Sequence, residues 1–361
     1  MAGTSLDLRL LPNYPALILL NQQYYAKAGG DALSSSTHLS SHWRAYTQGS
    51  QVEIDNEGCL VNLRGEGFGS YRDERWLKRL ADYICCTIHF LQGEYKREVI
   101  CLTKFALSLI KKIPFGNHYF SYDLFRQICA FAVVMQYFHP HGRKRFTILV
   151  IGDGYGFLAA LVKSVYPDAL VVLVDIGRTL LFQCFYLQVM YPKHIHIVLG
   201  CHGEDRSQPL DADFLYCPTD KLEDLQDYRH CLAINVCSMQ EMNKAEIERH
   251  FQHLRAQAEA GALFYCCNRE SKVLPDGERV DFESYPWLPT DRHLIDGYPS
   301  VYRFWFSMRS KRNAPKWLGI RLPFVDGPDG PIRHRLTVLG GARETCVLGR
   351  PTEGELYGHP G

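Results

Sequence analysis

The sequence lacks the features that mark membrane-spanning and nucleic-acid-binding proteins. None of its apolar runs reaches the about 18 to 20 residues that a membrane-spanning helix needs. Its 40 Lys and Arg residues nearly balance its 39 Asp and Glu residues, so no global basic field would attract nucleic acid or an anionic membrane surface. We therefore expect neither a nucleic acid nor a membrane among the partners of this protein.

The sequence also shows no sign of a disulfide framework or of secretion. Its 13 cysteines are odd in number, contain no CxxC pair and lie in apolar runs such as Tyr83–Leu91 and Leu263–Cys267. This distribution is typical of buried thiols in a reducing compartment. Near the N-terminus, Ala16–Leu20 is shorter than the about 7 to 15 apolar residues of a signal-peptide core. We expect a cytoplasmic protein.

The chain has the composition of a folded globular protein, with 361 residues of which 46% are hydrophobic and 22% charged. Residues 1–140 are predicted to form a mostly helical extension, because Glu74–Leu91, Tyr95–Ile113 and Tyr122–Phe138 carry apolar residues at helical spacing. A core domain is expected over residues 141–310. Residues 311–361 are expected to hold a C-terminal strand and an irregular tail.

Short β-branched runs alternate with helical segments beyond residue 140. This alternation predicts a doubly wound α/β fold, in which helices cover both faces of a mostly parallel sheet. A glycine-rich turn at Arg64–Ser70 has no predicted strand before it. The strands are expected at Phe146–Ile151, Ala169–Val174, His194–Leu199, Cys231–Val236, Ala262–Cys267, Val301–Met308 and Arg335–Leu339.

A ligand-binding turn is predicted where the first of these strands ends. Gly152, Gly154 and Gly156 alternate with Asp153 and Tyr155 between the strand and a helix. Glycine permits positive φ angles and close approach of a ligand, and the first turn of the helix offers unpaired N–H groups. A purely structural turn is the alternative.

The second strand ends in an acidic residue at the position that a ribose-binding carboxylate would take. Asp175 follows Gly152 by 23 residues, close to the separation of about 20 found in dinucleotide-binding folds. A nicotinamide site would need a third small residue where this chain has Phe157. The pattern therefore favours a nucleoside ligand without a pyrophosphate, with a nicotinamide cofactor as the alternative.

The segment Gly-Asp-Gly-Tyr-Gly resembles the first motif of class I S-adenosylmethionine methyltransferases. Three further segments, Ala169–Gln188, Leu232–Met242 and Phe264–Arg269, are similar to a bacterial family of sugar O-methyltransferases. The resemblance extends over residues 40 to 310, beginning at Ser41-His-Trp43. Asp153 departs from it, because the family often has a further glycine there.

The resemblance implies a Rossmann-like fold of the class I methyltransferase type, S-adenosylmethionine as cofactor and a sugar hydroxyl as methyl acceptor. It also implies a substrate contact for Asn268 and Arg269. Asp220 is expected to contact the cofactor. Because an acidic residue at the start of a helix can equally be a cap, capping is the alternative for Asp220. The cofactor-binding residues expected are Gly152, Asp153, Gly154, Tyr155, Gly156, Asp175, Ile176, Asp220, Asn235 and Ser238.

A sugar hydroxyl is a weak nucleophile, so its methylation benefits from a general base. Glu241 follows the fourth strand by a few residues, where this fold places its ligands. His293, in the Pro-rich segment after the fifth strand, is the second candidate. The alternative for Glu241 is structural, because Ser238 and Glu241 have the spacing of a capping box.

No metal is expected. The fourth strand is followed by no pair of carboxylates, and the histidine pairs 194/196 and 250/253 have no further ligand at a suitable spacing. The Asn/Asp-Pro-Pro-Tyr/Phe signature of many N-methyltransferases is absent, which argues against methylation of nucleic-acid bases. The cluster Arg143–Arg145 is expected to be a solvated linker, with contact to a phosphate as the alternative.

The long N-terminal region is expected to act as a lid. We expect residues 40–140 to fold over the carboxyl ends of the strands, exclude water and form much of the acceptor pocket. A dimerisation surface, giving a homo-oligomer, is the alternative. Two other functions stay open: N-methylation of an amino sugar, and non-catalytic binding of S-adenosylmethionine.

Overall fold

A computed structural model describes nine stretches of the chain. These are residues 8–22, 40–42, 51–54, 60–64, 76–113, 119–140, 142–199, 211–306 and 314–340.

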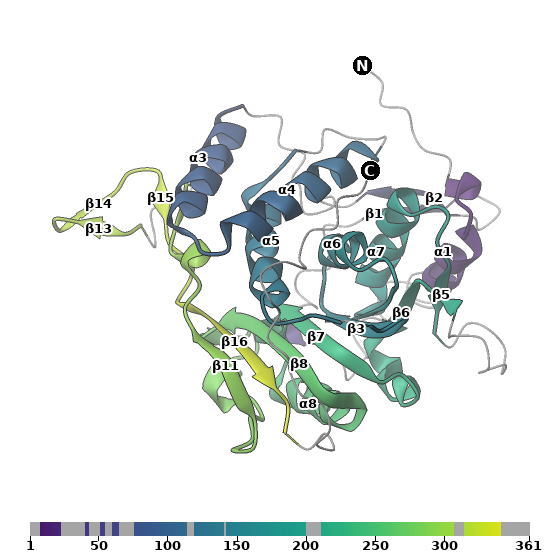
Figure 1. Cartoon of the computed structure of the whole chain (residues 1–361). Coiled ribbons are helices and arrows are strands. Elements are labelled where there is room, and N and C mark those ends of the chain that lie inside the picture. The colour runs from purple at the N-terminus through teal and green to yellow at the C-terminus, as the bar shows by residue number, and fades with distance from the viewer. Residues whose placement is uncertain are drawn as a thin grey trace.

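The central feature is an eight-stranded sheet with the order β11-β16-β8-β7-β3-β4-β6-β5 (Figure 1). β16 is antiparallel to both of its neighbours, and the other described pairs are parallel. The predicted doubly wound, mostly parallel sheet is therefore confirmed. The strands are β3 (Phe146–Ile151), β4 (Ala169–Asp175), β5 (His196–Val198), β6 (Phe214–Pro218), β7 (His230–Val236), β8 (Ala258–Arg269), β11 (Arg292–Gly297) and β16 (Ile332–Val338).

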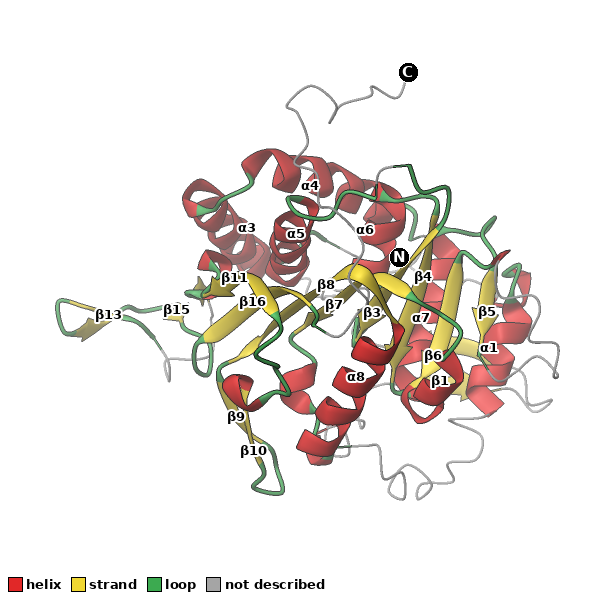
Figure 2. Ribbon diagram, turned by 60° about the horizontal axis from the view of Figure 1, so that its bottom comes forward, coloured by secondary structure: helices red, strands yellow, loops and turns green. Residues whose placement is uncertain are grey.

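Helices cover both faces of this sheet, because alternate apolar side chains of each strand point to opposite faces. In β3, Ile148 and Val150 pack with one cluster of buried residues, and Leu149 and Ile151 pack with another. Figure 2 shows α8 on the opposite side of the sheet from α4, α5 and α6. The first face carries α1 (Tyr14–Asn21), α4 (Lys96–Lys111), α5 (Tyr122–Met135), α6 (Phe157–Val165) and α7 (Gly177–Met190), and the second carries η4 (Thr219–Leu225) and α8 (Lys244–Gln257).

The helical N-terminal region is confirmed, and its helices pack on the core of the sheet, while their predicted action as a lid stays a prediction. α5 begins where the Ser121 hydroxyl accepts a hydrogen bond from the Leu124 N–H, and its Phe131 is fully buried in the core that includes β7 and β8. Removing residues 40–140 would expose that core. Ser40–His42, in the same region, reaches Glu241 beyond the carboxyl end of β7.

Three features of the chain differ from the prediction. The strand expected at 301–308 is instead a 3-10 turn, η7 (Ser300–Tyr302), followed by the short β12 (Trp305–Phe306). The Pro-rich segment before it contains β11, an edge strand. A strand does precede the glycine-rich segment, because β2 ends at Arg64, and residues 65–70 of that segment lie outside the described residues. The remaining elements are η1 (Leu8–Leu10), β1 (Gln51–Ile54), β2 (Leu60–Arg64), α3 (Trp76–Gln92), η5 (Met239–Glu241), β9 (Ser271–Val273), β10 (Arg279–Asp281), η6 (Phe282–Ser284), β13 (Lys316–Trp317), β14 (Ile320–Arg321) and β15 (Val325–Asp326).

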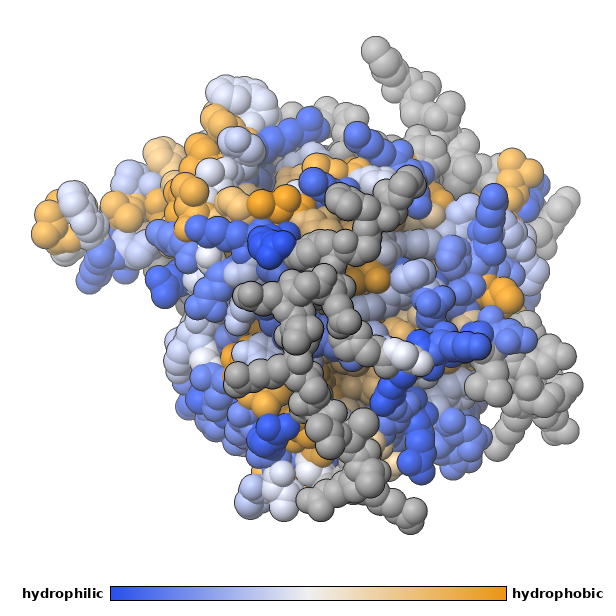
Figure 3. All heavy atoms as spheres, in the orientation of Figure 1, coloured by the Kyte–Doolittle hydropathy of each residue, from blue (hydrophilic) through white to orange (hydrophobic). Residues whose placement is uncertain are grey.

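Apolar side chains gather on the surface over α3 and on the projecting β13–β14 hairpin (Figure 3). Trp76 and Tyr83 of α3, and Trp317 and Leu318 of the hairpin, are each more than two-thirds exposed. Among the described helices, none is long and apolar enough to cross a membrane. The homo-oligomer stays a prediction, and this surface is where we would look for its interface.

Candidate functional site

The glycine turn between β3 and α6 has the backbone that the sequence predicts. Gly152, Gly154 and Gly156 have φ angles of +69°, +68° and +88°, which favour glycine. A Cβ atom at Gly152 would overlap the Ser238 side chain, and one at Gly156 would lie 3.3 Å from Leu187 of α7. A Cβ atom at Gly154 would meet nothing within 4 Å. The outer glycines therefore permit close packing, and the middle one borders open space.

Alanine substitutions should separate these two roles. The left-handed backbone costs an alanine about 1 to 2 kcal/mol, and overlap with Ser238 would add about 1 to 3 kcal/mol at position 152 alone. We expect Gly152→Ala to lower the thermal midpoint strongly. Gly154→Ala should lower it less but weaken ligand binding, because its methyl group enters the open space. Equal thermal midpoints for the two variants would contradict this division.

Asp153 caps the helix that follows the turn. Its two carboxylate oxygens accept hydrogen bonds from the N–H groups of Leu158 (2.9 Å) and Ala159 (2.7 Å). Burial raises the pKa of Asp153 to about 7, although these N–H groups favour the charged form. The side chain thus points into α6, and a glycine at this position would leave those helix N–H groups without this partner. The cofactor contact of Asp153 stays a prediction.

Asp175 ends β4 beside the glycine turn. Its Oδ1 accepts a hydrogen bond from the Ile176 N–H (2.8 Å), and its Oδ2 accepts one from the Gln183 side-chain amide (2.7 Å). Gln183 also donates to the Gly154 carbonyl oxygen (3.1 Å). Gln183, which the sequence analysis did not identify, therefore connects the carboxylate to the turn. Its own Oε1 is buried and has no hydrogen-bond partner among the described residues.

The Asp175 carboxyl group is perturbed by its surroundings. Burial raises its pKa to about 7, the Ile176 N–H and the Gln183 amide oppose this shift, and the charge of Glu241 adds to it. The folded protein consequently binds a proton that the unfolded chain releases at lower pH.

The pH dependence of stability should report this carboxyl group. Because its pKa rises from 3.8 to about 7 on folding, it lowers the free energy of unfolding as pH rises through that interval. We expect Asp175→Asn to reduce the difference in thermal midpoint between pH 5 and pH 8 in the ligand-free protein. Asp168→Asn, an exposed change at the other end of β4, is the control. The same pH dependence in both variants would contradict the assignment.

Asn235, Ser238 and Asn268 form a buried polar network at the carboxyl ends of β3, β7 and β8. The Asn235 amide donates to the Ile151 carbonyl oxygen and to Ser238 Oγ, and its oxygen accepts from the Met239 N–H and from Asn268. These four bonds use the full hydrogen-bonding capacity of the Asn235 side chain. A ligand contact through that amide would require one of them to break, and the cofactor role of Asn235 stays a prediction.

Gln240 extends the network to the end of β8. Its N–H donates to Asn268 Oδ1 (3.1 Å), and its side-chain oxygen accepts from the Arg269 N–H (2.7 Å). The Arg269 guanidinium lies 3.8 Å from the carboxylate of Asp329. The proposed substrate contacts of Asn268 and Arg269 also stay predictions.

Glu241 lies at the same end of the sheet, at the C-terminus of η5. Its Oε1 accepts a hydrogen bond from Lys272 Nζ (2.8 Å), and its Oε2 lies 3.4 Å from Nε2 of His42. The Ser40 hydroxyl donates to its backbone carbonyl oxygen. Burial would raise the pKa of Glu241, but His42 and Lys272 together hold it below its ordinary value. Glu241 is therefore a stable carboxylate held between two basic side chains.

The capping-box alternative for Glu241 is wrong. The Ser238 side chain makes no capping hydrogen bond to η5; its hydroxyl accepts from the Asn235 amide and donates to the Ile151 carbonyl oxygen. The helix that follows is capped by Asn243 instead, whose side chain accepts from the Glu246 N–H (2.8 Å).

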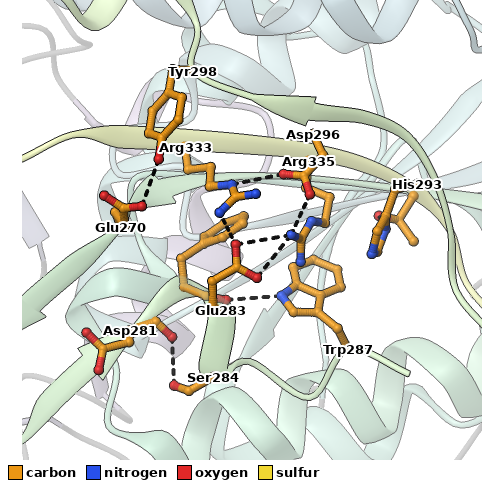
Figure 4. A network of polar contacts seen from close by, with 12 residues as sticks. Glu270, Asp281, Glu283, Ser284, Trp287, His293, Asp296, Tyr298, Arg333 and Arg335 are labelled. Atoms are coloured by element: carbon orange, nitrogen blue, oxygen red, sulfur yellow. Dashed lines mark hydrogen bonds and ion pairs between the residues drawn. The ribbon is translucent and has the colours of Figure 1, made fainter. Parts of the chain in front are cut away.

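His293 does not lie with these residues. It sits on β11, four strands from β3 and thus about 19 Å away across the sheet, and its Nδ1 is 2.9 Å from the Thr337 hydroxyl. Burial lowers its pKa, and its ring packs edge-on against Trp287 (Figure 4). The structure therefore gives no support to His293 as the general base.

The polar network around His293 has a structural explanation (Figure 4). The buried Arg335 of β16 donates to Glu283 and to Asp296 (2.7 Å), and its guanidinium lies 4.8 Å from the centre of the Trp287 ring. Arg333 joins the same two carboxylates. These ion pairs fasten β11 and η6 to β16, so the network stabilises this edge of the sheet.

Other predicted residues lie near the glycine turn. The exposed Asp220 follows β6, whose last residue Pro218 is paired with Asp175 in the sheet. Tyr155 packs edge-on against Phe182 and Tyr186 of α7. Asp220 is the second residue of η4, and Pro218 occupies the N-cap position.

The histidines considered as metal ligands in the sequence analysis make other contacts in the structure. Among the described residues, no three His, Cys, Asp or Glu side chains are grouped as a metal site would require. His196 Nδ1 lies 2.8 Å from the Tyr216 hydroxyl, and His250 Nδ1 lies 2.8 Å from the Glu246 carbonyl oxygen. Arg143, in the basic cluster before β3, forms an ion pair with Glu259.

No protein-family model matches the sequence, and no curated protein matches it. Parts of the fold are similar to those of solved structures. TrmN from Thermus thermophilus has 11% identity and a TM-score of 0.34, over 59% of this chain and 48% of that one. A phosphoethanolamine N-methyltransferase from Haemonchus contortus, in complex with S-adenosyl-L-methionine, has 15% identity and a TM-score of 0.27, over 39% and 28%. A precorrin-6y C5,15-methyltransferase from Geobacter metallireducens has 8% identity and a TM-score of 0.31, over 58% and 88%. The chain spans about half the length of TrmN and 28% of the Haemonchus enzyme.

Proposed function

We propose that this protein is an S-adenosylmethionine-dependent methyltransferase. The observation that carries the proposal is the joining of Gly154 and Asp175 through Gln183 at the carboxyl ends of β3 and β4. In an open α/β sheet this edge is where ligands bind. Open space at Gly154 suits a ligand, and a buried carboxylate at the end of the second strand suits a ribose diol.

The residues present fit the proposed cofactor. The Asp175 carboxylate accepts hydrogen bonds from Ile176 and Gln183 and also interacts with the Gly154 backbone, and its remaining lone pairs can accept from a ribose hydroxyl. The exposed Asp220 lies beyond the neighbouring strand, where an adenine amino group could be recognised. S-adenosylmethionine, when bound, supplies an electrophilic methyl group on a sulfonium centre.

We further propose a sugar hydroxyl as the methyl acceptor. This step rests on the resemblance of Ala169–Gln188, Leu232–Met242 and Phe264–Arg269 to sugar O-methyltransferases. The acceptor hydroxyl loses its proton as a C–O bond forms and the C–S bond breaks, which gives a methyl ether and S-adenosylhomocysteine. The protein must align the acceptor with the methyl group and remove that proton.

The pair His42 and Glu241 is suited to proton removal. The lowered pKa of Glu241 makes it a poor base by itself but a good partner for a protonated imidazole. Nε2 of His42 faces that carboxylate at 3.4 Å. The pairing favours the tautomer that carries its proton on Nε2, toward the carboxylate. We assign His42 as the base and Glu241 as its positioning residue.

Methyl transfer can be tested with the purified full-length chain and methyl-labelled S-adenosylmethionine. We expect S-adenosylhomocysteine to form when a carbohydrate fraction of cell extract is added, with the label in a base-stable methyl ether. Label on nitrogen would instead favour the amino-sugar N-methyltransferase. Bound cofactor without turnover in any fraction would favour a non-catalytic binding protein. The cytoplasmic location stays a prediction.

A further inference from the structure

A cavity of about 210 Å³ lies beside the proposed site, on the face of the sheet that carries α5. Its walls come from the C-terminus of α3, the middle of α5, β8, β16 and the loop around η7. Sites for drug-sized ligands occupy about 300 to 1,000 Å³. This cavity is smaller and suits a single ring.

The floor of the cavity is buried, aromatic and polar. His89 and Tyr265 are each 1% exposed, and both line the cavity. The Tyr265 hydroxyl lies 3.1 Å from Nδ1 of His334, a third lining residue. His89 Nε2 is 2.7 Å from the Phe304 carbonyl oxygen, and its Nδ1 makes no hydrogen bond with the described residues. The floor thus offers hydroxyl and imidazole groups next to ring faces.

The floor carries no full charge, because burial lowers the pKa of both His89 and His334, the latter to about 4. The charged lining residues, Glu94 and Arg303, lie at the exposed rim. An anionic ligand in this cavity would have no buried cation among the lining residues to pair with, and a cationic ligand would have no buried carboxylate there. A neutral ring that bears hydroxyl groups fits both the hydrogen-bonding groups and the aromatic faces.

A short chain of contacts connects the cavity to the glycine turn. Tyr302, in its wall, has its hydroxyl 3.5 Å from the Sγ atom of Cys237. Cys237 directly follows β7 and precedes Ser238, whose side chain leaves no room for a Cβ atom at Gly152. The cavity and the proposed cofactor site therefore share the carboxyl end of β7.

We propose that this cavity binds a sugar ring of the methyl acceptor, an inference that rests on the proposed function. Neutral imidazoles and tyrosine hydroxyls hold the hydroxyl groups of the ring, and the aromatic side chains hold its apolar face. Tyr298 extends this surface at the rim, where its hydroxyl donates to Glu270 (2.7 Å) and Arg333 lies over its ring. This fixes the ring of Tyr298 beside the opening.

Saturation-transfer NMR on the full-length chain tests the proposal with four probes: methyl β-D-glucopyranoside, methyl β-D-galactopyranoside, methyl α-D-mannopyranoside and methyl α-L-rhamnopyranoside. We expect saturation transfer to at least one of them. Tyr265→Phe, which removes one hydroxyl from the floor, should raise the Kd of the sugar that binds about 2- to 12-fold. Ala130→Leu, which fills the cavity from α5, should abolish the transfer. Tyr166→Phe, which removes a buried hydroxyl outside the cavity, should leave Kd unchanged.

Transfer to none of the probes, or transfer that Tyr265→Phe and Ala130→Leu leave unchanged, would overturn the proposal. A parallel calorimetric titration with S-adenosylmethionine separates this result from failure of the proposed function. Cofactor binding without cavity-dependent sugar binding would refute the cavity assignment alone. Cavity-dependent sugar binding without cofactor binding would keep the sugar site and refute the methyltransferase.

Discussion

Replacing Asp175 with Asn is expected to raise the Kd for S-adenosylmethionine about 10- to 150-fold. The carboxylate ends β4 beside Gly154, where its oxygens can accept hydrogen bonds from a ribose diol in addition to those from Ile176 and Gln183. Asparagine keeps the shape of the side chain but loses the charge and one acceptor. The lost interaction is therefore a charge-assisted hydrogen bond, and isothermal titration calorimetry measures it directly.

Two further variants make this result specific. Asp168→Asn removes a carboxylate from the exposed loop before the same strand and should leave the affinity unchanged. Gln183→Leu should weaken binding less than Asp175→Asn, because Gln183 holds the carboxylate and the turn in place without replacing the acceptor. Unchanged affinity for S-adenosylmethionine in a folded Asp175→Asn protein would contradict the assignment of Asp175 to the ribose.

Replacing His42 with Asn is expected to lower kcat about 10²- to 10⁴-fold, with little change in affinity for S-adenosylmethionine. The imidazole is the base that faces the Glu241 carboxylate, and its loss matters chiefly in the transition state. Glu241→Gln should also lower kcat, because a neutral amide stabilises a protonated His42 less well. Single-turnover rates, measured with the acceptor found by the labelling experiment, give the comparison.

A different result is expected if His42 and Glu241 have only a structural role. If the ion pair only anchors Ser40–His42 on the sheet, His42→Asn would lower the thermal midpoint and leave kcat near normal. Ser41→Ala is the matched control, because it removes another contact of the same segment, that of the Ser41 hydroxyl with the Asp276 N–H (3.4 Å). We expect the single-turnover rate to fall in His42→Asn and to stay near normal in Ser41→Ala. A near-normal rate in both would reject His42 as the base.

The parts of the site that depend on local sequence could be predicted. An apolar strand, alternating glycines and an apolar helix define β3, the turn and α6, and all three glycines have the positive φ angles that this reading requires. Asp175 was predictable for the same reason, since the end of a buried strand has a fixed place in a parallel sheet. The helices α3, α4 and α5 follow their apolar periodicity closely.

The residues that depend on distant contacts could not be predicted. Ser40 meets Glu241 across 201 residues of sequence, and nothing local to His42 indicates that it would reach that carboxylate. Gln183 is one of few polar residues in a mostly apolar helix, and only the packing of α7 places it beside Asp175. His293 was misplaced because a Pro-rich segment conceals the edge strand β11.

Calorimetric titration of the unmodified protein with S-adenosylmethionine tests the central claim most directly. The account predicts saturable binding of one S-adenosylmethionine per chain, binding of S-adenosylhomocysteine at the same site in competition, and no binding of NAD, because Phe157 occupies the position of the third glycine. Absence of saturable binding to S-adenosylmethionine, or tight binding of NAD in its place, would contradict it.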